Sequence, residues 1–266
     1  MTILNRTAAV AAAVESCHRL GETSVHRYLF VAIVACALAS AGDSHAKLLY
    51  INDFDGEAIG SVPTGWEKVF DGASQASVID DPVAGGNQVL ASSDLAHDAS
   101  RHDVGGSIFA VGDDSWTDYV VDYDALFPAD FYMGVLLRYN DDTNFYLFDR
   151  RSAGEAGNFD FWHQAGAWNR LGTGQFDAQP MEWYSFRLSV QGDSFEAYAA
   201  PAADNPDFSA DVPFVTGSDA TLASGPFGLY GLVYIDNLVI GETSTDVETA
   251  VEARGKLAVT WASLRR

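Results

Sequence analysis

One segment of the chain alternates strictly between apolar and polar side chains. Its apolar positions are Tyr119, Val121, Tyr123, Ala125 and Phe127, and three aspartates stand between or beside them. Successive side chains of a β-strand point to opposite faces, so this period of two predicts a strand with one buried and one solvated face. Such a strand must bury its apolar face against a second layer of structure.

Similar short segments recur at intervals of roughly 8–12 residues, the spacing typical of a β-sandwich. Turns of polar or glycine residues separate them, at residues 140–143, Gly166 and residues 191–193. No run of ten residues has a helical period, and no internal repeat is present. The sequence therefore predicts an all-β fold, a two-sheet antiparallel jelly-roll sandwich. The predicted strands are 48–54, 66–70, 88–91, 107–111, 117–127, 132–139, 144–150, 159–163, 168–171, 183–190, 194–199, 228–231 and 233–240.

Residues 1–46 have the composition of an export signal. An apolar run at 28–39 follows His26 and Arg27, and small residues follow the run up to Ala46. The run is too short to span a membrane, so it predicts a signal peptide and a secreted, extracellular or periplasmic protein. A translation start misassigned upstream, or a long leader, explains the residues before the run. The segment 33–36 also resembles a bacterial lipobox, and a lipid anchor on Cys36 is the alternative.

Charge and cysteine content limit the partners and the means of stabilisation. The chain has 37 acidic and 15 basic side chains, a net charge of −22, which argues against nucleic acid as a partner. Neutral sugars, metal cations and basic proteins remain compatible with this charge. Cys17 and Cys36 both lie in the leader, so the exported chain is predicted to have no disulfide. No later apolar run has the length of a membrane span.

The sequence predicts three regions along the chain. The leader at 1–46 is followed by the sandwich at 47–242 and by a linker and tail at 243–266. The tail, which becomes more basic, is predicted to be a disordered end or one short helix. A sorting or docking tag is the alternative.

A series of short motifs follows one order along the chain. The motifs are NDFDG at 52–56, GWEKV at 65–69, WTDY at 116–119, GVLLRY at 134–139, NFY at 144–146, WY at 183–184, GL at 228–229 and IDNLVI at 235–240. This order is similar to that of the concanavalin A-like lectin/glucanase jelly rolls of the laminin-G-like type, found in many secreted bacterial proteins, and it covers roughly residues 48–242. The resemblance implies two curved sheets, a glycan-binding concave face in many relatives and a structural calcium ion in some.

Catalysis by glucanases of this fold needs two carboxylates on one face of a strand. Their Glu-x-Asp-x-x-Glu motif is absent from this chain, and its glutamates stand singly. The sequence therefore predicts a lectin-like module that binds polysaccharide or glycan without cleaving it. Two alternatives remain open: a glycoside-acting enzyme similar to the 3-keto-disaccharide hydrolases, and an extracellular adhesion or structural module.

A sugar site needs a flat aromatic ring for the C–H face of a sugar and planar polar groups for its hydroxyls. The hairpins in the middle of the chain supply both kinds of side chain within a short stretch. Alternation predicts that Asp160 and Trp162 share one face of their strand and that His163 lies on the other. The predicted carbohydrate-binding residues are Arg138, Tyr146, Arg150, Asp160, Trp162, His163 and Trp168.

Oxygen-bearing side chains gather in the first and last predicted strands. If these strands lie side by side, the side chains converge, and Ca²⁺ binds six to eight such oxygens. A structural calcium ion would then tie both ends of a domain that has no disulfide. Turn formation and capping are the alternative role of the same residues. The predicted ligands are Asn52, Asp53, Asp55, Asp236 and Asn237.

Overall fold

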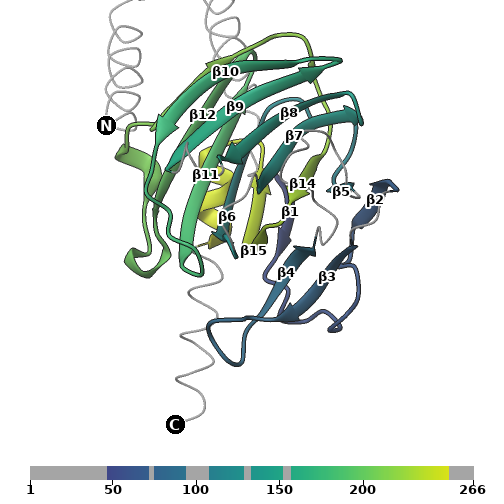
Figure 1. Ribbon diagram of the computed structural model, residues 1–266. Helices are drawn as coiled ribbons and strands as arrows, with labels where there is room; N and C mark the ends of the chain where they lie inside the picture. The colour runs from purple at the N-terminus through teal and green to yellow at the C-terminus, as the bar shows by residue number, and fades with distance from the viewer. Residues whose placement is uncertain (1–46, 72–74, 94–107, 129–132, 152–156, 252–266) are drawn as a thin grey trace, which may run out of the picture. The chain divides into compact units, whose positions relative to one another are not determined.

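Two antiparallel sheets make up the fold (Figure 1). The computed structural model describes residues 47–71, 75–93, 108–128, 133–151 and 157–251. Contacts divide the chain into two units, residues 1–45 and 46–266, and every described residue belongs to the second. The signal peptide, both cysteines and most of the tail therefore lie outside the described residues, and export remains a prediction.

The eight-stranded sheet has the order β13-β12-β11-β6-β15-β4-β3, and β1 also pairs with β15. Two short 3₁₀ turns, η1 (Ala202–Asp204) and η2 (Phe208–Ala210), follow β12. The strands of the eight-stranded sheet are β1 (Leu48–Asn52), β3 (Gln75–Asp80), β4 (Gln88–Ser93), β6 (Tyr119–Leu126), β11 (Trp183–Gln191), β12 (Ser194–Pro201), β13 (Val215–Ser218) and β15 (Tyr234–Gly241).

The seven-stranded sheet has the order β10-β9-β8-β7-β14-β5-β2. The predicted two-sheet antiparallel sandwich is thus confirmed, including the three predicted hairpins β7–β8, β9–β10 and β11–β12. Its strands are β2 (Trp66–Phe70), β5 (Ile108–Val111), β7 (Met133–Asp141), β8 (Asn144–Arg150), β9 (Asn158–Ala165), β10 (Trp168–Gln175) and β14 (Phe227–Gly231).

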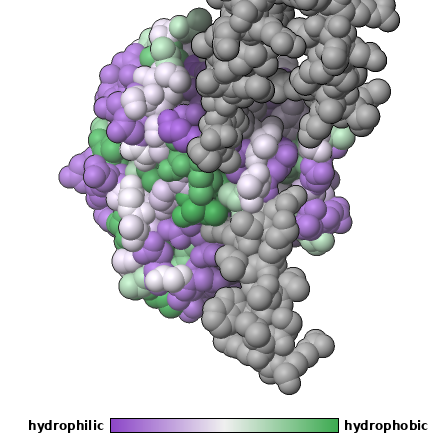
Figure 2. Space-filling model, turned by 180° about the vertical axis from the view of Figure 1, so that it is seen from behind, coloured by the Kyte–Doolittle hydropathy of each residue, from purple (hydrophilic) through white to green (hydrophobic). Residues whose placement is uncertain are grey.

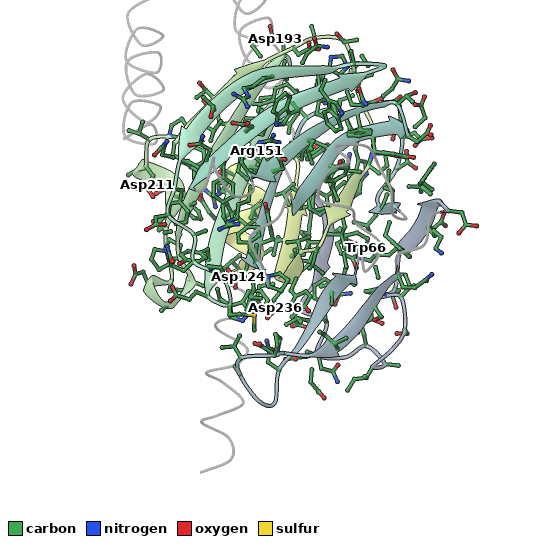
Figure 3. The ribbon with its side chains drawn as sticks, in the orientation of Figure 1. Trp66, Asp124, Arg151, Asp193, Asp211 and Asp236 are labelled. Carbon is green, nitrogen blue, oxygen red and sulfur yellow. The ribbon has the colours of Figure 1, made fainter. Side chains whose placement is uncertain are left out.

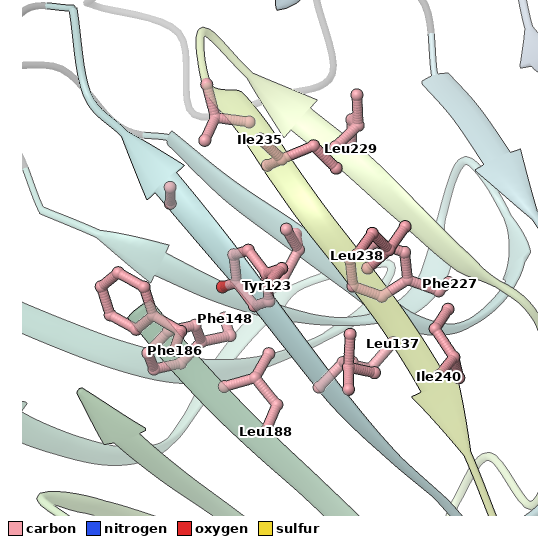
Figure 4. Close-up of a cluster of buried hydrophobic side chains, with 14 of the residues drawn as sticks. Tyr123, Leu137, Phe148, Phe186, Leu188, Phe227, Leu229, Ile235, Leu238 and Ile240 are labelled. Carbon is pink, nitrogen blue, oxygen red and sulfur yellow. The ribbon is translucent and has the colours of Figure 1, made fainter. Parts of the chain in front are cut away.

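Aromatic and aliphatic side chains together fill the space between the sheets (Figure 4). Tyr123 of β6 stacks on Phe186 of β11 at 5.6 Å between ring centroids, and Phe148 of β8 stacks on Phe159 of β9 at 5.5 Å. Burying each such side chain stabilises the fold by about 1.5–3 kcal/mol. The alternation in β6 is therefore what places its aromatic face in the core.

The seven-stranded sheet carries a second apolar layer on its other face, which we call the outer face. Alternate residues of β7 and β8 point to the outer face. Leu136 and Leu147 belong to the apolar layer on this face, while their neighbours along each strand belong to the core between the sheets. Two partly exposed tryptophans, Trp162 and Trp168, pack against this layer. The layer contains Ile108, Leu136, Tyr139, Phe145, Leu147 and Tyr230.

Several element boundaries differ from the sequence-based prediction. Strands β3 and β13 were not predicted, because each is short and offers few apolar positions; only Ala76 and Val78 of β3 are buried apolar residues. Strand β10 continues to Gln175 through a run containing two glycines, which weaken a strand signal. The first strand ends at Asn52, since Phe54 has a left-handed backbone with φ of 58°.

A short helix follows β15 at residues 244–251, within the linker and tail predicted at 243–266, for which one short helix was one of the alternatives. Thr243 and Asp246 cap its start reciprocally: the Asp246 N–H donates to Thr243 Oγ1, and the Thr243 N–H donates to Asp246 Oδ2. Val247 is fully buried against Val120 and Val239 of the eight-stranded sheet. The helix thus belongs to the sandwich, and none in the described part of the chain is long and apolar enough to cross a membrane.

Seen from behind, the part of the surface that the described residues form and that is not covered in the view is mostly hydrophilic, with a smaller hydrophobic area (Figure 2). This distribution agrees with the excess of acidic residues over basic ones.

Candidate functional site

The predicted carbohydrate-binding residues divide between the two faces of the seven-stranded sheet. Asp160, Trp162 and Trp168 lie together on the outer face, as alternation along β9 predicted. The other four lie on the core side and contact protein groups: Arg138, Tyr146, Arg150 and His163.

Arg138 is buried and ties several loops together at one end of the sandwich. Its guanidinium donates to the carbonyl oxygens of Thr117, Gly192 and Leu222 at 2.8–3.0 Å. It also pairs with Asp118 at 3.2 Å. These contacts hold the loops in place and use the guanidinium N–H groups of Arg138 within the protein.

Tyr146 and His163 meet at the carboxylate of Asp219. The Tyr146 hydroxyl donates to Asp219 Oδ1 at 2.6 Å, and His163 Nδ1 lies 3.3 Å from Asp219 Oδ2. Burial would raise the pKa of Asp219, but hydrogen bonds from Tyr146 and Thr221 lower it to about 2. Both predicted ligand residues therefore fix the segment around Asp219.

Arg150 points toward the core at the end of β8. Its guanidinium lies 5.7 Å from the ring centroid of Phe127 and donates to the carbonyl oxygen of Ala178. Arg150 thus joins the two sheets and lies on the opposite face from Trp162.

A group of charged side chains surrounds Trp162 on the outer face. We call Asp149, Arg151, Asp160, Trp162 and Arg170 the Trp162 cluster. Asp149 of β8 and Asp160 of β9 are directly opposite in the strand register. The guanidinium groups of Arg151 and Arg170 lie 4.9 and 4.7 Å from the centroid of the indole ring. The indole N–H of Trp162 donates to Asp149 Oδ1 at 3.1 Å.

Ion pairs compensate the two facing carboxylates. Arg151 Nη1 lies 2.9 Å from Asp149 Oδ2, and its Nε lies 3.4 Å from Asp160 Oδ2. Arg170 Nε lies 3.1 Å from the same oxygen of Asp160. Like charges directly opposite on neighbouring strands are unfavourable, so the two arginines stabilise an otherwise strained pair.

The surroundings of Asp149, which faces Asp160, shift its pKa. Burial raises its pKa to about 7, and the charge of Asp160 acts in the same direction. Arg151 and the indole of Trp162 oppose this shift only in part. Asp149 can therefore hold a proton near neutral pH, opposite a second carboxylate on the neighbouring strand. Shifted pKa values of this kind are frequent in functional sites.

Asp160 has hydrogen-bonding capacity that the protein does not use. Its side chain is 1% exposed, and neither carboxylate oxygen accepts a hydrogen bond. Arg151 and Arg170 approach within ion-pair distance, but their N–H groups do not reach hydrogen-bonding geometry with it. Leaving a buried acceptor unpaired costs about 1–3 kcal/mol, so such a group needs an explanation.

Aromatic rings continue the outer face beside the cluster. Trp168 packs edge-on against Trp162 at 6.1 Å and against Phe145 at 5.8 Å. It also contacts Tyr230 at 6.3 Å. Trp162 and Trp168 are both partly exposed, so aromatic surface lies next to the carboxylates.

Sequence analysis missed Asp149, Arg151 and Arg170. Asp149 and Arg151 continue the alternation of β8, but the predicted strand ended at Arg150 and its polar positions were not assigned to a face. The search for two carboxylates was also restricted to a single strand. The structure brings Asp149 and Asp160 together from two strands, through a register that the sequence does not state.

The predicted calcium residues converge only in part. Burial and, to a smaller extent, the nearby charges of Asp124 and Asp55 together raise the pKa of Asp236 to about 6. Figure 3 shows Asp124 and Asp236 close together, well apart from Arg151 of the Trp162 cluster. Asn87 donates to Asp236 Oδ2 at 2.9 Å, and Asn237 donates to Asp124 Oδ2 at 2.9 Å. Amide N–H groups therefore already contact these carboxylates.

Asn52 and Asp53 take part in a local turn. The Phe54 N–H donates to Asn52 Oδ1 at 2.8 Å, and the Asp55 N–H donates to the carbonyl oxygen of Asp53 at 2.8 Å. Within the described ranges, no group of three or more histidine, cysteine, aspartate or glutamate side chains is arranged to hold a metal ion. Calcium binding at this end of the sandwich stays a prediction.

Comparisons with known proteins complete the description. No family model matches the chain, and no curated protein matches its sequence. Among solved structures, it is similar to the carbohydrate-binding module CBM66 from Bacillus subtilis, with 17% identity, a TM-score of 0.47 and coverage of 69% of this chain and 99% of that one. It is also similar to domain 4 of AbnA, a GH43 extracellular arabinanase from Geobacillus stearothermophilus, with 14% identity, a TM-score of 0.46 and coverage of 77% and 98%.

A third similar structure is a Bacillus subtilis protein of unknown function with a galectin-like fold, with 13% identity, a TM-score of 0.49 and coverage of 75% and 97%. None of the three is described as a laminin-G-like protein of the concanavalin A type. The strand order of the two sheets establishes a jelly-roll sandwich, and the more specific type remains a prediction.

Proposed function

We propose that the protein binds carbohydrate through the Trp162 cluster and Trp168. Sugar recognition combines aromatic surface for the C–H face of a sugar with carboxylates and guanidinium groups for its hydroxyls. The outer face of the seven-stranded sheet supplies these groups within one hairpin and its neighbouring strand. This combination of side chains favours a module that binds carbohydrate.

The observation that carries the proposal is the carboxylate of Asp160. Its two buried oxygens accept no hydrogen bond and lie beside partly exposed aromatic rings. A sugar hydroxyl is a neutral donor of suitable size for such an acceptor. Hydrogen bonds to a charged group are worth about 1.5–3 kcal/mol each, which is enough to contribute measurable affinity.

The test is binding of the full chain to soluble polysaccharides in affinity gels and by calorimetry. We expect Trp168→Ala and Asp160→Asn each to weaken binding about tenfold or more, which corresponds to the loss of ~1.4 kcal/mol. Trp183→Ala is the matched control, because Trp183 is also partly exposed and also begins a strand. Its binding should equal that of the wild-type chain. Equal retention of all four proteins would contradict the proposal.

Hydrolysis is the second candidate, and the pairing of Asp149 with Asp160 favours it. Two facing carboxylates, of which Asp149 has a raised pKa, can divide the roles of acid and base in glycoside cleavage. The same polysaccharide incubations distinguish the two: steady release of reducing sugar that Asp149→Asn abolishes would establish an enzyme.

We propose calcium separately, near Asp236. Asp55, Asp124 and Asp236 concentrate negative charge there, and turning the amide oxygens of Asn87 and Asn237 inward would add neutral ligands. Chelation with EDTA should then lower the melting temperature, and Asp236→Ala should remove that sensitivity. Asp142→Ala, in an exposed hairpin turn, is the control and should keep it. A melting curve that EDTA leaves unchanged would rule out a structural ion.

A further inference from the structure

Strand β9 presents three side chains in a row on the outer face. Asp160, Trp162 and Gln164 occupy alternate positions of a strand whose pairing with β8 is regular. The spacing of a strand places Asp160 and Gln164 about 13 Å apart, with the indole between them. Trp168 of β10 is the register partner of Gln164, so aromatic surface lies beside both ends of this row.

Buried acceptor atoms that accept no hydrogen bond lie at both ends of the row. They are the two carboxylate oxygens of Asp160 and Oε1 of Gln164. Few buried polar groups in native proteins lack a partner, and two such residues on one face of one strand point to a ligand that supplies donors at both places. This pattern goes beyond the Trp162 cluster, to which Gln164 does not belong.

All three atoms are acceptors, and this limits the ligand. A glycan that carries carboxylate or sulfate groups would bring further acceptors and negative charge to them, in a chain whose net charge is already −22. A cationic ligand would gain little binding free energy at Gln164, because this side chain is neutral. It would also gain little at Asp160, because Arg151 and Arg170 already offset the negative charge there. Hydroxyl groups complement both ends.

We propose that β9 is a two-position site for a neutral, hydroxyl-rich glycan of at least two sugar units. One unit donates to Asp160 and another to Gln164, and the chain follows β9 between these two positions, with Trp168 beside the Gln164 end. Gln164 is therefore a specificity-determining residue for chain length. This inference rests on the proposed carbohydrate binding, which it deepens.

The experiment uses the full chain and two sets of probes. Affinity gels contain a neutral polysaccharide (β-glucan, xylan or galactomannan) or an anionic one (alginate or carrageenan). We expect retention by at least one neutral polysaccharide and by neither anionic one. Calorimetry then compares the monosaccharide with oligosaccharides of the retained polysaccharide, which should bind the wild-type chain at least tenfold more tightly than the monosaccharide does.

Variants at both ends of the row separate the two positions. Gln164→Leu and the shorter amide Gln164→Asn should each lose most of the tenfold gain for oligosaccharides while leaving the affinity for the monosaccharide unchanged. Asp160→Asn should weaken both. Asn169→Ala is the control, because Asn169 lies in the adjoining strand and alternates to the other face. Unchanged melting temperatures show that the variants are folded.

The outcomes distinguish the inference from the function on which it rests. Retention by anionic polysaccharides alone, or an oligosaccharide gain that survives both Gln164 variants, overturns the two-position site but leaves carbohydrate binding intact. Absence of retention by every polysaccharide overturns both.

Discussion

Gly172→Ala and Gly174→Ala should each reduce the free energy of unfolding by about 3 kcal/mol or more. Both glycines lie in β10, the edge strand of the seven-stranded sheet. A Cβ atom on Gly172 would lie 1.8 Å from the carbonyl oxygen of Thr216, and one on Gly174 would lie 2.0 Å from that of Phe214. These oxygens belong to the backbone at β13, the edge of the other sheet.

The expected loss is large because no side chain can rotate to relieve the contact. Overpacking in a well-packed interior typically costs about 1–3 kcal/mol, and here the backbones of two sheets must separate. A domain of this kind is stable by only about 5–15 kcal/mol, so the loss is easily measured. Denaturant unfolding followed by tryptophan fluorescence would give the values.

Gly85→Ala is the matched control, since its added methyl group meets nothing within 4 Å. Its free energy of unfolding should stay within about 0.5 kcal/mol of the wild-type value. If the Gly172 and Gly174 variants unfold like this control, β10 and β13 do not close the sandwich as tightly as described.

The sequence predicted the strands whose two faces differ clearly. In β6, aromatic residues alternate with aspartates, so both the strand and its buried face follow from the pattern. The hairpins followed from polar turns for a similar reason, because residues such as Asn140 and Gly192 suit tight turns. Strands β3 and β13 lack this contrast and were found only in the structure.

The sequence predicted only those features of the site that depend on a single strand. Alternation correctly placed Asp160 and Trp162 on one face of β9. The pattern did not reveal that this face is the outer one, nor that Arg138 and Tyr146 lie on the core side with backbone and carboxylate partners. It also could not supply the register that sets Asp149 against Asp160, since register depends on how two strands pair.

The free energy of unfolding should fall as the pH rises from about 4 to 7, and Asp149 should account for roughly 4 kcal/mol of the change. In the folded protein its pKa is raised to about 7, mainly by burial, whereas in the unfolded chain it is near the ordinary value of about 3.9. Between these two values the folded state holds a proton that the unfolded state has lost. Raising the pH therefore favours unfolding, and the contribution is complete below pH 4 and lost above pH 7.

Asp149→Asn isolates this contribution, because asparagine does not titrate but keeps an acceptor for the indole N–H of Trp162. The stability of the variant relative to the wild-type protein should rise by roughly 4 kcal/mol between pH 4 and 8, since only the wild type must bury a new charge. Subtracting the two curves removes the titration of every other group. Asp114→Asn, at an exposed position, should give a flat difference. A flat difference for Asp149→Asn as well would mean that Asp149 stays ionised, with Arg151 compensating its charge throughout, and that the cluster holds no proton near neutral pH.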